Sequence, residues 1–152
     1  MGGDSGRQPV EQVVGHLRGD LAFGAAGANS AVYMGDLPQS AVPLSTVTDV
    51  QTAYNAGTTN VAEVVGFLIA TTQLSTFNPL TTAADITLMA TGTFAATATG
   101  TKRTEATPNG RRNSDTSAYK VYARYQPTGT AATTGASTSI VEFVAQNQRG
   151  NS

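Results

Sequence analysis

The chain of 152 residues contains neither cysteine nor tryptophan. Without cysteine no disulfide can hold the fold, so packing, backbone hydrogen bonds or partner subunits must do so. A small secreted domain held together by disulfides is therefore excluded. A zinc site needs three or four Cys, His or carboxylate ligands, and a chain with the single histidine His16 and no cysteine cannot supply them. We predict neither a metal nor another cofactor.

Charge is also scarce, since charged residues make up 12% of the chain and the formal net charge is −1. Disordered proteins normally combine high charge with low hydrophobicity, and this chain lacks the charge. Threonine and alanine are each more numerous than the 16 glycines, so hydroxyls and small side chains should cover the surface. Such a surface favours packing against neighbouring molecules, which suits a component of an assembly.

Long apolar runs and a basic character are missing as well. The longest apolar run, VVGFLIA at residues 64–70, falls short of the ~20 residues needed to span a bilayer. The start, MGGDSGRQPVEQVV, lacks the charged-then-apolar order of a signal peptide. A pI near 5.7 argues against a nucleic-acid binder, which usually has a basic face. We predict a soluble protein without membrane or nucleic-acid partners.

The N-terminal region differs from the rest of the chain. Residues 1–30 are rich in glycine and polar residues and predict a flexible arm. Within it, Val10, Val13, Val14 and Leu17 recur at helical spacing, which indicates a short helix at 10–18. The predicted domain follows at residues 31–148, and residues 149–152 form a tail.

From residue 31 onward, short β-like runs alternate with turn residues. The stretch NAGTTN at 55–60 combines Asn and Gly, which tolerate positive φ, with apolar flanks. The alternation slips near Ser45–Thr46, as it would at a β-bulge. A Gly/Thr/Ala-rich connection separates the last two runs. We predict strands at 31–37, 41–54, 61–72, 84–94, 119–126 and 140–146.

Six to eight strands with at most one short helix indicate an all-β fold. The prediction is an antiparallel β-sandwich or jelly roll with a partly extended N-terminal arm. In the run at 119–126, strand alternation puts Tyr119 and Tyr125 on one face and Tyr122 on the other. This split argues against a sugar platform of stacked rings, so a glycan-binding module is the less favoured alternative.

Catalytic patterns are not evident. His16 has no visible partner to orient it, as a catalytic histidine requires. The acidic residues are scattered singly along the sequence, without a D-x-D or E-x-x-H pattern. We therefore predict that the protein is not an enzyme. The tripeptide RGD at 18–20 would need an exposed loop tip to act in adhesion, and a chance match is the simpler interpretation.

Basic residues concentrate in one stretch, GTKRTEATPNGRR at 100–112, most of which belongs to a polar loop predicted at 101–117 around a Pro-Asn-Gly turn. Two interpretations of this loop remain open. It is a solvated loop that keeps a charge-poor protein soluble, or it contacts an acidic partner surface. The candidate contact residues are Lys102, Arg103, Arg111 and Arg112.

Three stretches carry a resemblance to a known group of proteins: VTDVQTAYNAGTTNVAEVVGF, SAYKVYARYQPTGTAATTGASTSIVEFVAQN and the Thr/Ala-rich run between them. In this order of strands and turns, the chain resembles small β-rich structural proteins of tailed-bacteriophage virions, the head decoration or cement type. The similarity covers residues 40–147 and brings no catalytic motif. It implies a jelly roll or related sandwich, often a homotrimer, made in the host cytoplasm and seated on the virion capsid.

The resemblance and the composition agree on a structural role. The expected function is a capsid decoration (cement) protein that binds the outside of the assembled head, contacts the major capsid protein and stabilises the shell. The alternative within the same class is a neck, tail or head-fibre component. The native mass separates these alternatives, because a trimer suits a cement protein and a ring of six or twelve copies suits a neck or tail.

Overall fold

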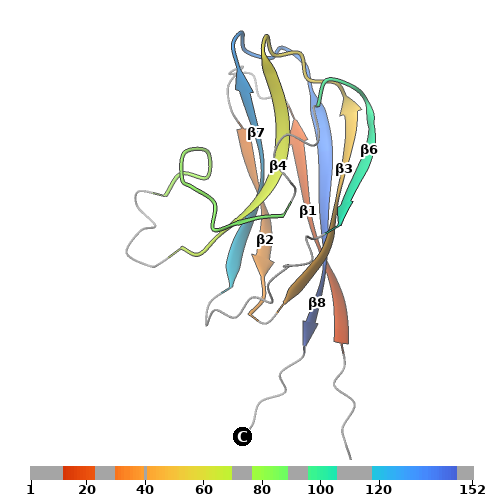
Figure 1. The fold of residues 1–152 in the computed structure, drawn as a ribbon, viewed down its shortest axis with the longest axis vertical. Coiled ribbons are helices and arrows are strands. Elements are labelled where there is room, and N and C mark those ends of the chain that lie inside the picture. Colours follow the sequence, from red (N-terminus) through yellow and green to blue (C-terminus); the bar gives the residue numbers. More distant parts are fainter. Residues whose placement is uncertain are drawn as a thin grey trace, which may run out of the picture.

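The computed structural model describes residues 12–22, 30–39, 41–69, 77–88, 96–105 and 118–146. Over these ranges the chain is all-β and contains no helix, which confirms the predicted fold class. Two antiparallel four-stranded sheets face each other as a sandwich (Figure 1). The strands are β1 (Gln12–Ala22), β2 (Ser30–Leu37), β3 (Val42–Thr52), β4 (Thr59–Phe67), β5 (Ile86–Thr87), β6 (Gly100–Glu105), β7 (Tyr119–Thr128) and β8 (Ala136–Gln146).

The two sheets have different strand orders. Sheet A runs β1-β8-β3-β6, and sheet B runs β2-β7-β4-β5. Neighbouring strands in each sheet are antiparallel. The first and last described residues, Gln12 and Gln146, are direct partners in the β1–β8 register. The jelly-roll form of the sandwich stays a prediction.

Strand alternation produces the core. Along β7 the side chains from Tyr119 to Tyr125 alternate between buried and half-buried, which confirms the predicted division of its tyrosines between two faces. The inward residues of β4 and β7 meet Val50, Leu21 and Val141 of sheet A in one cluster. Tyr54 stacks on Tyr125 in the same core, with ring centroids 4.1 Å apart.

The inner face of sheet A also contains buried hydroxyl groups. Thr48 Oγ1 and Ser139 Oγ lie 2.9 Å apart on neighbouring strands. The Tyr54 hydroxyl lies 3.0 Å from Ser137 Oγ and donates to the Leu21 carbonyl at 3.2 Å. Each of these buried groups therefore has a partner inside the sandwich, as burial of polar atoms requires.

Two predictions about secondary structure are wrong, one for the N-terminal region and one for the polar loop that begins near residue 100. The N-terminal arm at 1–30 and its short helix at 10–18 are contradicted from Gln12 onward, because β1 is a full strand of sheet A. Leu21 of this strand is only 2% exposed, so β1 is part of the domain. Residues 1–11, 23–29 and 147–152 lie outside the described residues.

The polar loop predicted at 101–117 is contradicted over residues 101–105, and residues 106–117 lie outside the described residues. Residues 100–105 form β6, which pairs with β3 over six residues. The strand predicted at 84–94 is confirmed only at Ile86–Thr87, where β5 pairs with β4, and residues 89–95 lie outside the described part of the chain. The predicted bulge in β3 is present, with the register shift between Pro43 and Ser45.

Residues 77–82, here called the cover segment, lie over the part of the outer face of sheet B that β4 and β7 form (Figure 1). The Arg124 guanidinium donates to the carbonyls of Pro79 and Thr82 at 3.0 and 3.3 Å. Beneath this segment the outward residues Glu63 and Phe67 of β4 are only 5% and 1% exposed. Sheet B is therefore buried on both faces along β4.

The Gly/Thr/Ala-rich connection between β7 and β8 packs against the connection between β3 and β4 of the same chain. The Asn55 side-chain oxygen accepts hydrogen bonds from the amides of Thr133 and Thr134 at 2.7 and 3.1 Å. Gly135, at φ 147°, lies so close to the Tyr54 ring that a Cβ there would overlap it. The small residues of this connection thus permit a close approach within the subunit.

Candidate binding surface

The outer face of sheet A is the one broad sheet face in the described ranges whose side chains are mostly exposed or half-buried. We call it the sheet A surface. Because neighbouring strands are antiparallel, their outward side chains form rows across the sheet. The surface consists of Val14, His16, Arg18 and Asp20 of β1; Thr138, Ile140, Glu142 and Val144 of β8; Ser45, Val47, Asp49 and Gln51 of β3; and Thr101, Arg103 and Glu105 of β6.

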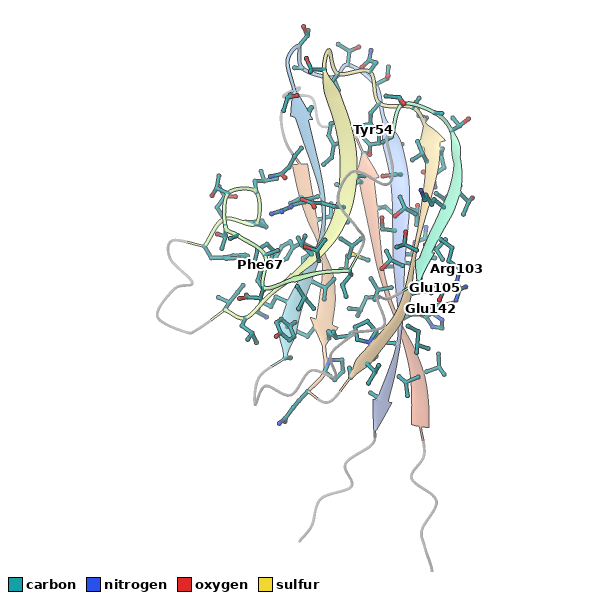
Figure 2. The ribbon with its side chains drawn as sticks, in the orientation of Figure 1. Tyr54, Phe67, Arg103, Glu105 and Glu142 are labelled. Atoms are coloured by element: carbon teal, nitrogen blue, oxygen red, sulfur yellow. The ribbon has the colours of Figure 1, made fainter. Side chains whose placement is uncertain are left out.

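Glu142 is the centre of the first polar network on this surface (Figure 2). Its carboxylate accepts a hydrogen bond from Ser45 Oγ at 2.6 Å and one from the Arg103 guanidinium at 2.9 Å. Arg103 also donates to Glu105 at 2.8 Å. His16 Nε2 lies 3.9 Å from the other carboxylate oxygen of Glu142. Residues from β1, β8, β3 and β6 thus meet at one carboxylate.

The electrostatics of this network follow from its contacts. The hydrogen bond from Ser45 and the charge of Arg103 lower the pKa of Glu142 below its ordinary value. The hydrogen bond to Glu105 and the charges of both carboxylates raise the pKa of Arg103. Each partner therefore favours the charged form of the other.

Ser45, Glu142 and His16 superficially suggest a nucleophilic triad, but their order is wrong for one. In such a triad the histidine contacts the serine and the acid lies behind the histidine. Here the carboxylate of Glu142 lies between the other two, so His16 does not receive the proton of Ser45. Ser45 is also only 1% exposed. The prediction that the protein is not an enzyme stays a prediction.

A second polar network crosses the same sheet at the row of Thr138, two rows from that of Glu142. Thr138 donates to Asp20 at 2.6 Å, and the Gln51 amide donates to Thr138 at 3.0 Å. Gln51 also reaches Asp49 at 3.2 Å, and Thr101 donates to Asp49 at 2.6 Å. The side chains at this row are thus held in place across all four strands.

One end of the sheet A surface is apolar. Val14 is 57% exposed and pairs with Val144, which in turn pairs with Val42. Leu44, at the bulge of β3, is 40% exposed. An ordered polar area therefore borders an exposed apolar strip, a combination typical of surfaces that contact other proteins.

The structure places two of the four predicted contact residues, and Arg111 and Arg112 lie outside the described residues. Arg103 projects from the edge strand β6 onto the sheet A surface, where Glu105 and Glu142 neutralise it. Lys102 precedes it, half-buried, and points to the other side of β6. The structure thus does not bring Lys102 and Arg103 together as one basic contact.

Acidic residues outnumber basic ones on the sheet A surface. Two bases, Arg18 and Arg103, face four acids: Asp20, Asp49, Glu105 and Glu142. The surface is therefore complementary to a basic partner.

A cluster on the outer face of sheet B was not predicted from the sequence. The Tyr33 hydroxyl donates to Asp36 at 2.5 Å, Lys120 Nζ lies 3.2 Å from the same carboxylate, and Tyr33 is 47% exposed. Burial of the hydroxyl, followed by its bond to Asp36, raises the pKa of Tyr33 to about 12. The neighbouring Tyr122 ring lies 5.3 Å from that of Tyr33. Only the pairing of β2 with β7 brings these side chains together, and the sequence does not specify this pairing.

The RGD tripeptide lies inside β1, with all three residues paired to β8. Arg18 donates to Asp20 on the same strand at 3.1 Å. Because it is not at a loop tip, the interpretation as a chance match to the adhesion motif holds.

Among the described residues, no group of three or more His, Cys, Asp or Glu side chains could hold a metal ion. No helix in this part of the chain is long and apolar enough to cross a membrane.

Comparison with known proteins does not identify a family for the chain. It matches no family model, no curated protein and no solved structure.

Proposed function

We propose that this protein is a bacteriophage capsid decoration protein that binds the outside of the assembled head through the sheet A surface and stabilises the shell. The observation that carries this proposal is the surface itself. Its polar side chains are tied to one another across four strands, and exposed Val14 and Leu44 border them. The resemblance of residues 40–147 to decoration proteins supplies the class of partner.

An ordered surface of this kind suits binding without chemistry. Association costs free energy whenever mobile side chains must be immobilised, and side chains that are already held reduce that cost. A protein that binds assembled shells but not dispersed capsid subunits shifts the equilibrium toward the shell by mass action. The acidic character of the sheet A surface favours a basic site on the major capsid protein.

The test uses heads assembled from the major capsid protein of the same phage without this protein. We expect the purified chain to co-sediment with these heads in a saturable manner and to raise the temperature at which they break open. Binding should weaken as salt rises, because part of the contact is electrostatic. Absence of co-sedimentation, or equal binding to unassembled capsid subunits, would contradict the proposal.

A pair of variants locates the contact. Val14→Glu places a charge on the apolar strip, at a side chain that is already 57% exposed, so the fold should survive while head binding is lost. Ala83→Glu places the same charge on an exposed position beside the cover segment of sheet B and should leave binding unchanged. The opposite pattern would move the contact to sheet B.

A second candidate, glycan binding, is favoured by one observation, the exposed ring of Tyr33 beside Asp36 and Lys120. An aromatic face next to charged hydrogen-bonding groups can hold a sugar ring. Tyr119 and Tyr125 cannot take part, because both are buried. An oligosaccharide that binds the wild type but not Tyr33→Ala would favour this function over the first.

A further inference from the structure

The four edge strands of the sandwich differ in how they discourage pairing with another chain. Short length, bulges and charged side chains protect edges in natural sheets. β5 has two residues, β2 has a register shift between Tyr33 and Gly35, and β6 has six residues of which three are charged. β1 is different, with eleven residues in unbroken register with β8. Within the described residues, its other edge faces no paired strand.

The sequence in the middle of β1 is complementary to itself when reversed. Residues 17–21 read Leu-Arg-Gly-Asp-Leu. Read from either end, they present leucine, then a charge, then glycine, then the opposite charge, then leucine. Two such strands that run antiparallel would place unlike charges opposite each other, which stabilises a cross-strand pair.

We propose that β1 pairs with β1 of a second copy of this chain, antiparallel and centred on Gly19, so that two sheets A join into one. A two-fold contact of this kind uses the same patch on both subunits and requires it to be self-complementary. In this register Arg18 lies opposite Asp20 of the partner subunit, and Asp20 lies opposite the partner's Arg18. Leu17 lies opposite the partner's Leu21 on the inner side.

The charged side chains are available for this contact. Arg18 and Asp20 lie on the sheet A surface, with 65% and 62% of their side chains exposed. They now contact each other along one strand at 3.1 Å. A guanidinium has several donors in one plane, so Arg18 can keep this bond and donate to Asp20 of the partner subunit as well.

Gly19 does not by itself support the dimer, because the fold of one subunit already explains it. A Cβ at this position would lie 2.7 Å from Cγ of Met34 in β2. Two independent features carry the inference instead: the long β1 edge in unbroken register with β8, and the reversed charge order of Arg18 and Asp20. It also differs from the trimer that the resemblance implies, since a two-fold strand pair closes at two subunits.

The test is the native mass of the full chain by light scattering with analytical ultracentrifugation. We expect twice the 15.6 kDa of one chain. Arg18→Asp and Asp20→Arg each place like charges opposite one another at two points of the dimer. Each should weaken the dimer on the order of 100-fold, since two attractive cross-strand pairs become repulsive.

Mixing the two variants provides the decisive control. A strand with Asp at both positions and a strand with Arg at both positions are complementary, so the mixture should form a heterodimer although each variant alone is largely monomeric. The double variant Arg18→Asp/Asp20→Arg keeps the reversed charge order and should dimerise like the wild type. A monomeric or trimeric wild type, or single variants that dimerise unchanged, would overturn the inference. Failure of the mixture to form a heterodimer would do the same.

Discussion

The two outer faces of the sandwich are built from similar strands but are stabilised differently. On sheet B, the cover segment lies over β4 and β7, and the ion pair of Glu63 and Arg124 is almost completely buried. On sheet A, Arg103 and Glu142 form an ion pair of similar chemistry whose side chains are 52% and 28% exposed (Figure 2). A buried charge without its partner is costly, whereas an exposed one is solvated by water. The same kind of bond is therefore structural on one face and available for binding on the other.

The largest expected effect comes from the buried pair. Arg124→Met leaves Glu63 buried without a cation and removes the donors to Pro79 and Thr82. Loss of one partner of a buried ion pair costs about 3–5 kcal/mol, and we expect a loss of that size in the free energy of unfolding, measured with urea. The double variant Glu63→Leu/Arg124→Met removes both charges and should recover a large part of the loss. Equal losses in both variants would contradict this explanation.

The next effect concerns the titration of Tyr33. Its pKa is raised to about 12 in the folded protein, above the unfolded value of about 10. Its contribution to stability is thus fully present below pH 10 and is lost as the pH rises through 12. Absorbance titration, with Tyr33→Phe as the reference, should show this late transition. In Asp36→Asn the pKa should fall only in part, because burial remains its largest cause.

A smaller effect is expected for the exposed pair of sheet A. Arg103→Met leaves Glu142 with its hydrogen bond from Ser45 and access to water. Exposed ion pairs contribute little to stability because water and salt screen them, so the free energy of unfolding should change far less than in Arg124→Met. A loss as large as that of Arg124→Met would remove the distinction between the two faces.

The smallest effect concerns how the stability of the fold decreases at acid pH. The pKa of Glu142 is lowered first by Ser45, and that of Asp20 first by Thr138. Both groups stabilise the fold above their unfolded pKa values, and the contribution is lost as the pH falls through the lower folded values. NMR titration should show the pKa of Glu142 rising in Ser45→Ala, while that of Asp20 stays unchanged. A constant pKa of Glu142 would mean that Ser45 does not determine it.

Most of the fold could be predicted from the sequence, and the exceptions have physical causes. In β7 large inward side chains alternate with polar outward ones, so the period of two is visible. In β1 the inward positions include Gly15 and Gly19, which have no side chain to mark them as apolar. The outward Val14 is apolar instead, and together with Leu17 it mimics helical spacing. The sequence of β6 predicts a loop because it consists largely of Thr, Lys and Arg, and an edge strand can have such a composition.

The candidate site was less predictable than the fold. Arg103 could be selected as a charged residue, but its partner Glu142 is 39 positions away along the chain. Only the pairing of β3 with both β6 and β8 brings the two together. The same holds for Asp20 and Thr138, which are separated by 118 positions. Strand register determines such networks, and short-range patterns do not contain it.

The pairing of Gln12 with Gln146 has a mechanical consequence. Force applied to the chain at these two residues would act at one end of the β1–β8 pair. Hydrogen bonds between antiparallel strands are perpendicular to the strands, so such a pull would load them one after another, as in opening a zipper. The sandwich should therefore yield at low force when pulled from Gln12 and Gln146. A load spread over the sheet A surface, as in a shell contact, would be shared by four strands at once.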